Sequence, residues 1–269
     1  MIASWPYCRP VDEELIAHWK TLGADWQPQH MLVAYKGGKA RAFVHGERRG
    51  DQHNILLLAM LPGAVEETVA LIEDAERAAR AEGVTRLCGP HWRSARYYAG
   101  YVLGNEPYHP HWANDGTEAF VRAGFRISHP ALILVADAGS ASPPTGSVAE
   151  GYEIIEANTA DEFGAKPFRL AAMHDGREVA TCGARLFPRL MSPKGGPVGQ
   201  LGYIGTDEAH QGKGLATEMT RMSLKRLRDM GASEVLIATG LDNYPALRAY
   251  EKAGFSRRYN INEWSKKLE

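Results

Sequence analysis

The stretch Gln211-Gly212-Lys213-Gly214-Leu215-Ala216 lies between an apolar run typical of a strand, residues 200–206, and an amphipathic helix predicted from residue 214 onward. Its two glycines let the backbone approach a ligand without obstruction by side chains. The free N–H groups in the first turn of the helix favour an anion, because the positive end of the helix dipole adds to them. We therefore predict a binding site for a diphosphate.

Two common nucleotide loops do not fit this stretch. A loop of the Walker type would need glycine in place of Asp207 and serine or threonine in place of Gly214. A dinucleotide fingerprint would end in glycine or alanine, but the chain has Thr217 there. The remaining pattern, Q-x-x-G-x-A after a strand, resembles the loop by which the GNAT superfamily of acyl-CoA-dependent N-acyltransferases holds the pyrophosphate of coenzyme A. A glycine-rich turn without a ligand is the alternative.

The residues after the loop strengthen this resemblance. Apolar residues at helical spacing predict a helix over 214–230, and a strand follows at 235–238. The segment 243–255 then resembles the second GNAT motif, with Pro245 suited to a first helical turn and Gly254 to the position just past the helix end. Because the two motifs occur together and at this distance, they favour a coenzyme site over an empty turn.

The resemblance implies roles for individual residues. Asn243 would hydrogen-bond the pantetheine arm, and Tyr250 would act as the general acid that protonates the departing thiolate. Residues 204–206 would splay from the neighbouring strand and pair with pantetheine through their backbone. Without a ligand, Asn243 would be a helix cap and Tyr250 a core aromatic. The predicted coenzyme contacts are Ile204, Gly205, Thr206, Gln211, Gly212, Lys213, Gly214, Leu215, Ala216 and Asn243.

The general base is left open. Members of the family often carry a glutamate on the strand before the loop, but the matching residue here is Gln200, which cannot accept a proton. An amine with a pKa near ~10 must lose a proton before it attacks the thioester. Asp207, Glu208, a histidine of the aromatic insertion at about 91–112 or a chain of water molecules are the alternatives.

The chain contains two related halves. Its 269 residues suit two domains of ordinary size. Residues 119–125, Ala-Phe-Val-Arg-Ala-Gly-Phe, echo residues 249–255, Ala-Tyr-Glu-Lys-Ala-Gly-Phe, and the same order of helix, glycine and strand precedes each. We predict an α/β fold of two GNAT-like domains in tandem, each with a central mixed, mostly antiparallel sheet flanked by helices. The expected boundaries are 1–136 for a degenerate domain, 137–150 for a linker and 151–269 for the catalytic domain.

The N-terminal copy lacks what the chemistry requires. Before its helix, predicted over 65–82, stands Leu61-Pro62-Gly63-Ala64, which is too short to wrap a pyrophosphate. Phe120 stands where the second copy has Tyr250, and a phenyl ring has no proton to give. We therefore expect no coenzyme site in this copy.

An insertion at about 91–112 distinguishes the N-terminal copy. The aromatic and histidine side chains of this insertion suit either an acceptor pocket or a domain interface. Between residues 156 and 168 the second copy has eleven residues where the family usually has two helices that wall the acceptor site, so the insertion is the leading substitute. The candidate acceptor contacts are Trp92, Tyr97, Tyr98, Tyr101, Tyr108, His109, His111, Trp112 and Gln200. A metal site from His91, His109 and His111 is disfavoured, because no cysteine or carboxylate stands at ligand spacing.

Composition limits the class of protein. The chain is 44% hydrophobic and has a formal net charge of −1, without the basic field of proteins that work along nucleic acid. No apolar run reaches the ~18 residues that cross a membrane, and no leader is recognised. Cys8, Cys88 and Cys182 are too few for a disulfide framework. We expect a cytoplasmic protein with reduced thiols.

These features predict a GNAT-type N-acetyltransferase that moves an acetyl group from acetyl-CoA to the amine of a small molecule. The acceptor would be a metabolite, an amino sugar, an antibiotic-like amine or a thiol-precursor amine, because near-neutral charge disfavours nucleic-acid or histone-like acceptors. No metal is expected, and a homo-oligomer is compatible with the sequence. The alternative is a non-catalytic acyl-CoA-binding or regulatory module, for which the missing glutamate at Gln200 is the main support.

Overall fold

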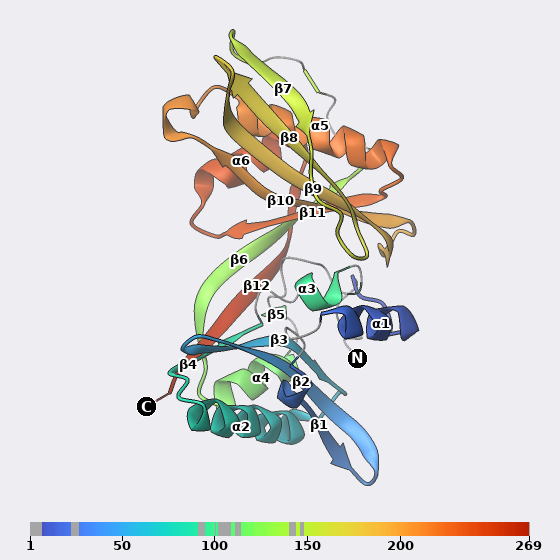
Figure 1. The fold of residues 1–269 in the computed structure, drawn as a ribbon, viewed down its shortest axis with the longest axis vertical. Coiled ribbons are helices and arrows are strands. Elements are labelled where there is room, and N and C mark those ends of the chain that lie inside the picture. The colour runs from blue at the N-terminus through green and yellow to red at the C-terminus, as the bar shows by residue number, and fades with distance from the viewer. Residues whose placement is uncertain are drawn as a thin grey trace. The chain divides into compact units, whose positions relative to one another are not determined.

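The chain forms two compact units. The computed structural model describes residues 7–22, 27–90, 95–99, 101, 109–110, 114–139, 144–145 and 148–268 (Figure 1). Unit 1 comprises the described residues of Met1–Tyr98, Val102–Ala131 and Asn260–Glu269, and unit 2 comprises those of Ala99–Tyr101 and Leu132–Tyr259.

Unit 1 is built on a mixed sheet with the order β1-β2-β3-β4-β12. Its strands are β1 (Met31–Lys36), β2 (Lys39–Arg49), β3 (Gln52–Met60), β4 (Arg86–Gly89), the short β5 (His109–Pro110) and the end of β12 (Ser256–Lys267). Its helices are α1 (Glu13–Thr21), η2 (Pro28–His30), α2 (Val65–Ala81), α3 (Ala95–Tyr98) and α4 (Asn114–Arg122). Neighbouring strands are antiparallel except β3 and β4, which are parallel and are joined through α2.

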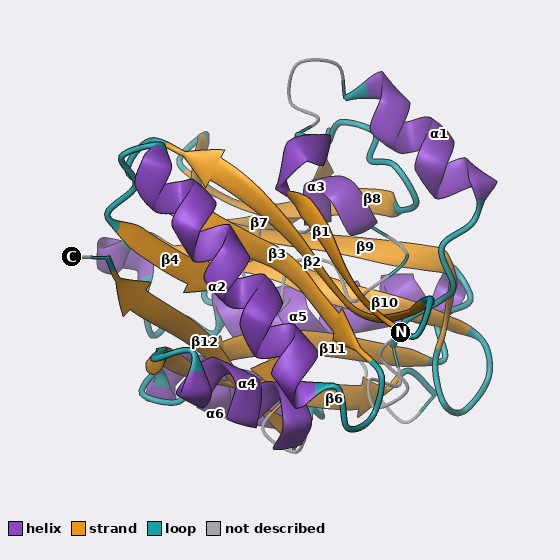
Figure 2. Cartoon of the chain, turned by 90° about the horizontal axis from the view of Figure 1, so that it is seen from below, coloured by secondary structure: helices purple, strands orange, loops and turns teal. Residues whose placement is uncertain are grey.

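One face of this sheet is covered by α2, which packs on β1, β2 and β3 (Figure 2). The buried side of the helix carries Leu71, Ile72 and Ala79, spaced so that they share one helical face. They join Val44, Ile55 and residues of α4 in one apolar core. The helix predicted over 65–82 is thereby confirmed.

Unit 2 repeats this plan with the order β7-β8-β9-β10-β11-β6. Its strands are β7 (Tyr152–Ala157), β8 (Lys166–His174), β9 (Arg177–Met191), β10 (Pro197–Thr206), β11 (Glu234–Gly240) and the second half of β6 (Arg126–Asp137). Its helices are η4 (Glu208–His210), α5 (Leu215–Asp229) and α6 (Tyr244–Ala253). Here β10 and β11 are the parallel pair.

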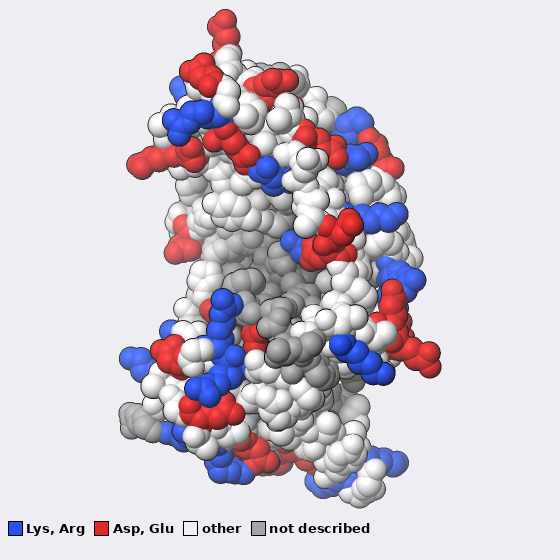
Figure 3. Space-filling view, viewed as in Figure 1, with Lys and Arg blue, Asp and Glu red and all other residues white. Residues whose placement is uncertain are grey.

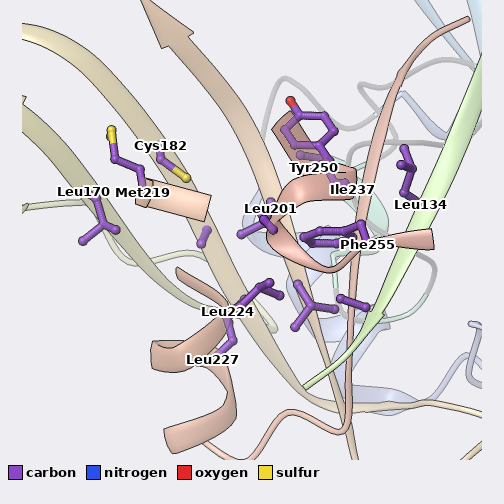
Figure 4. Packing of buried hydrophobic residues seen from close by; sticks show 14 of the residues in the cluster. Leu134, Leu170, Cys182, Leu201, Met219, Leu224, Leu227, Ile237, Tyr250 and Phe255 are labelled. Atoms are coloured by element: carbon purple, nitrogen blue, oxygen red, sulfur yellow. The ribbon is translucent and has the colours of Figure 1, made fainter. Parts of the chain in front are cut away.

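Apolar residues of α5 and α6 pack with Leu201, Ile237 and Phe255 in the core of unit 2 (Figure 4). The predicted fold class, two mixed α/β domains in tandem, is confirmed.

The last strand of each repeat completes the sheet of the other unit. β6 follows α4 in the chain, but its residues from Leu132 belong to unit 2, where β6 lies beside β11. β12 follows α6, but its residues from Asn260 belong to unit 1, where Trp264 pairs with Gly89 of β4. The sequence analysis did not predict this exchange.

The segment between β7 and β8 contains no helix. Glu162 and Ala165 form an isolated bridge around a turn there, which leaves this edge of unit 2 without the two helices that the family usually has. None of the helices formed by the described residues combines the length and the hydrophobicity that a membrane crossing requires.

A buried polar cluster lies in unit 1. His45 Nδ1 lies 2.6 Å from the Tyr98 hydroxyl, and the Tyr97 hydroxyl donates to Glu47 at 3.1 Å. Burial lowers the pKa of His45 to about 3 and that of His53 to about 4, against 6.5 for an ordinary histidine. Both imidazoles are therefore neutral in the folded protein near pH 7.

We expect the free energy of unfolding to fall as the pH drops from 6.5 toward 4, because the unfolded chain binds protons that the folded chain excludes. The slope should be about 1.4 kcal/mol per pH unit for each buried histidine. Urea unfolding at a series of pH values measures it. His53→Leu should flatten the slope, since neither ring nitrogen of His53 has a hydrogen-bond partner among the described residues. An unchanged slope in this variant would contradict the assignment.

A substitution of Trp264 tests whether β12 completes the sheet of unit 1. The ring of Trp264 is 3% exposed and stacks on Phe120 at 5.6 Å between centroids. Trp264→Ala should destabilise the protein by about 3–5 kcal/mol, because it leaves a cavity in the core of unit 1. Val121→Ala on α4, where the side chain is 56% exposed, is the control and should change the unfolding midpoint little. Equal effects of the two substitutions in urea would contradict the placement of β12.

Candidate functional site

The loop after β10 has the backbone that the sequence predicts for an anion site. Gly212 and Gly214 adopt φ values of 75° and 82°, which residues with a side chain rarely adopt. Helix α5 begins after Gly214, and no described side chain caps it. The N–H groups of its first turn are therefore available to a ligand. Gln211 ties the loop to the strand, because its side-chain amide donates to the carbonyl of Thr206 at 3.3 Å.

The predicted coenzyme contacts differ in what they can offer. Lys213 and the loop glycines are exposed, whereas Leu215 is buried in the core and can offer only its backbone N–H. A Cβ at Gly205 would lie 2.4 Å from the Tyr203 hydroxyl oxygen, so a larger residue there would require the Tyr203 ring to move. Tyr203 is itself exposed beside the strand end. The sequence analysis did not select Tyr203, since an aromatic residue on a strand usually packs in a core.

β10 and β11 separate beside the loop. Their parallel pairing covers Val198–Gln200 and Glu234–Leu236, and no further pair is formed in the described part of either strand. β10 continues to pair with β9 on its other side as far as Thr206. The backbone of residues 204–206 thus has one edge without a neighbouring strand, and an extended ligand can pair there as an added strand would. The splay predicted from the sequence is confirmed.

The two residues of the second motif lie on α6. Asn243 is the N-cap of this helix, and its Oδ1 accepts from the N–H of Ala246 at 3.4 Å. Tyr250 is mostly buried, and its hydroxyl points away from the Phe255 ring (Figure 4). Asn243 therefore has the role of a cap, and its contact with pantetheine stays a prediction. The orientation of Tyr250 is compatible with an acid at the rim of the core.

Gln200 is the last residue of β10 that pairs with β11. Its side chain is 1% exposed, and its Oε1 has no hydrogen-bond partner among the described residues. Directly opposite on β9 stands Arg185, whose Nη1 donates to the Glu162 carboxylate. Residues opposite each other in an antiparallel pair share one face of the sheet, so these polar groups lie together. Sequence reasoning missed Arg185 and Glu162, because the register that brings them to Gln200 is not visible along the chain.

The aromatic insertion is divided between the units. Tyr101 belongs to unit 2, where its ring stacks on Phe163, in the short segment between β7 and β8, at 6.4 Å. Tyr97 and Tyr98 are buried in unit 1, and their hydroxyls contact Glu47 and His45. For those two rings the burial favours packing over an acceptor pocket. His109 is described only as part of β5, and Trp92, Tyr108, His111 and Trp112 lie outside the described residues.

The corresponding end of α2 in unit 1 is already occupied. The backbone N–H of Gly63 donates to the carboxylate of Asp115 at 2.7 Å, so a side chain of the protein itself stands where an anion would bind. Phe120 is fully buried against Trp264 and Phe125. That this copy binds no coenzyme stays a prediction.

No group of three or more metal-ligating side chains gathers among the described residues. Of the three histidines weighed as ligands, His91 and His111 lie outside that part of the chain. The surface shown in Figure 3 carries acidic and basic side chains interspersed, in keeping with the net charge of −1.

Each of the two mixed sheets has one pair of parallel strands, and a helix connects the two strands of that pair. This arrangement is that of a tandem GNAT fold. Residues 138–255 match the acetyltransferase (GNAT) family. A solved tandem GNAT protein from the clavulanic acid biosynthesis pathway has a TM-score of 0.70, with 98% of this chain and 90% of that chain covered. Its sequence identity is 15%, so it shows the fold alone.

Curated relatives match over shorter stretches. The mycothiol acetyltransferase of Catenulispora acidiphila is 44% identical over 63 residues, which are 23% of this chain and 20% of the relative. That of Cellulomonas flavigena is 34% identical over 91 residues, which are 33% of this chain and 26% of the relative. The matched part thus spans a fifth to about a quarter of these relatives' length.

The substitution Gly214→Ala tests whether the loop after β10 binds coenzyme A. Because Gly214 has φ 82°, alanine there should strain the backbone by about 1–2 kcal/mol, and a loop that shifts to relieve this strain should misplace its N–H groups and weaken coenzyme A binding roughly tenfold. Calorimetric titration with coenzyme A measures the change. Gly176→Ala is the matched control: Gly176 has φ 74° in the β8–β9 turn, and alanine there should strain the chain without changing affinity. Equal affinities of the two variants would contradict a coenzyme site at the loop.

Proposed function

We propose that unit 2 transfers an acetyl group from acetyl-CoA to the amine of a small molecule. The observation that carries the proposal is the combination of the uncapped α5 terminus, preceded by two glycines in left-handed conformations, with the splayed strands β10 and β11 directly before it. The first suits a diphosphate and the second suits the amide-bearing pantetheine arm. The match of residues 138–255 to the acetyltransferase (GNAT) family supports this assignment.

In the proposed reaction the amine nitrogen attacks the thioester carbonyl carbon. A C–N bond forms, the C–S bond breaks, the nitrogen releases a proton and the thiolate takes one up. The loop N–H groups would hold the pyrophosphate, and the backbone of residues 204–206 would align the pantetheine. Tyr250 would protonate the thiolate, since its hydroxyl can donate and lies on the rim of the unit 2 core.

The acceptor is proposed to be a discrete metabolite. The matching relatives are mycothiol acetyltransferases, which supports a small-molecule amine, including a thiol precursor. The ring pair of Tyr101 and Phe163 and the polar groups at Gln200 offer both an apolar face and hydrogen bonds to such a molecule. Buried and reduced thiols at Cys88 and Cys182 support a cytoplasmic location.

A second candidate is a regulatory module that binds acyl-CoA without turnover. It is favoured by Gln200, because an amide on the strand before the loop cannot serve as a general base. The two candidates share the coenzyme site and differ only in the release of free thiol.

Tyr250→Phe separates the two candidates. Removal of the acid should lower kcat by about 100-fold or more while the affinity for acetyl-CoA stays within about twofold. Thiol release from acetyl-CoA across a panel of amines measures kcat, and calorimetry measures affinity. Tyr244→Phe is the matched control on the same helix, since Tyr244 is 67% exposed. Full activity of Tyr250→Phe would remove its acid role, and binding without turnover in the wild type would favour the regulatory module.

A further inference from the structure

The loop after β10 is joined by a side-chain contact to the outermost strand of its sheet. His210, the residue directly before Gln211, has its Nδ1 2.9 Å from the hydroxyl oxygen of Tyr152. Tyr152 begins β7, which β8 and β9 separate from β10 in the sheet (Figure 1). The hydrogen bond therefore connects segments that are 58 residues apart in the chain and are not neighbours in the described sheet.

The ring of Tyr152 is itself held in place by its neighbours. Tyr152 and His174 stand directly opposite each other in the antiparallel pair of β7 and β8, and their rings stack at 4.5 Å between centroids. His174 Nδ1 lies 2.8 Å from the carbonyl oxygen of Gly151. Because a carbonyl oxygen only accepts, this nitrogen carries the proton, and the hydrogen bond fixes the orientation of the imidazole. Tyr152 also packs against the apolar core of unit 2, so its hydroxyl is offered to His210 from a fixed position.

The segment that His210 anchors has little stability of its own. It is the single 3₁₀ turn η4, and no described side chain caps the start of this turn. The hydrogen bonds of a 3₁₀ turn have poorer geometry than those of an α-helix. The loop that follows is exposed, and Gly212 and Gly214 add backbone freedom to it. Gln211 ties this loop to the end of β10, whereas His210 ties it to β7.

From these contacts we infer that Tyr152 is a positioning residue for the diphosphate loop and that it acts through His210. The inference rests on the proposed function, which assigns coenzyme A to the loop. When a loop samples several conformations, the apparent Kd of its ligand rises as the fraction of molecules with a binding-competent loop falls. The hydrogen bond between Tyr152 and His210 raises this fraction before the coenzyme arrives. Tyr152 thus strengthens coenzyme binding without touching the coenzyme.

The effect of Tyr152 is confined to the part of the coenzyme that the loop holds. In the proposed function the pantetheine arm pairs with residues 204–206, and the pairing of β10 with β9 fixes those residues independently of His210. Tyr250 lies on α6, away from the contact with β7. Loss of the hydrogen bond should therefore raise the KM of acetyl-CoA and leave kcat at saturation unchanged. A thioester donor without a diphosphate, S-acetylpantetheine, should have the same kcat/KM with and without the hydrogen bond.

Calorimetric titration with coenzyme A tests the inference and requires binding but no turnover. Tyr152→Phe keeps the ring that stacks on His174 and removes the hydroxyl, so it should raise Kd about three- to tenfold. His210→Leu should raise Kd by a similar factor. His210→Asn keeps a polar group near the place of Nδ1 that can bond the Tyr152 hydroxyl, and its Kd should stay within about twofold of that of the wild type. This rescue by asparagine would not be expected if His210 only filled space.

Ile154→Val is the matched control, because Ile154 lies on β7 and packs against the same core as Tyr152. It should lower the Tm and leave Kd unchanged, which separates a loss of stability from a loss of positioning. An unchanged Kd in a folded Tyr152→Phe, or an equal rise of Kd in Ile154→Val, would overturn the inference and leave the proposed function intact. An equal loss of kcat/KM with S-acetylpantetheine would also overturn the inference alone. A wild-type protein that does not bind coenzyme A would overturn both.

Discussion

The site depends on the parallel pairing of β10 with β11, which covers Val198–Gln200 and does not continue in the described residues beyond them. Gly199 lies within this paired stretch, and a Cβ there would come within 2.9 Å of Leu227 on α5 and 3.1 Å of Val235 on β11. The absence of a side chain lets the helix pack closely on the strands where they begin to separate. Close packing at that point holds the last turn of α5 against the paired part of the two strands.

In unit 1, side chains of the protein lie at the positions that correspond to the candidate site of unit 2. β3 and β4 pair in parallel over Gln52–Asn54, and Asn54 holds the place in this pair that Gln200 holds in unit 2, with its Oδ1 likewise buried and unpaired among the described residues. The opposite residue is Glu47, which accepts from the Tyr97 hydroxyl. The end of α2 is occupied by the Asp115 carboxylate. The first copy thus keeps the scaffold and one polar position while side chains of the protein itself occupy its sites.

The sequence predicted the loop, the flanking helices and the second motif because each depends on local spacing and on glycine conformations. It did not predict which sheet β6 and β12 join, since an alternating strand reads the same whichever edge it completes. The pairing of Arg185 with Gln200 also escaped prediction, because register across β9 and β10 is set by the whole hairpin. The insertion was recognised by its rings, but the division of Tyr97, Tyr98 and Tyr101 between two units is a property of tertiary packing.

The exchange of strands determines which of the two units can be completed first during translation. The edge of β4 that β12 covers is made about 170 residues before Asn260, the first residue of unit 1's share of β12. At about 5–20 residues per second, ribosomal synthesis leaves that edge without its native neighbour for on the order of 10 s. An open strand edge is a template for wrong pairing between nascent chains. Unit 1 therefore stays incomplete until the last residue of unit 2, Tyr259, has been synthesised.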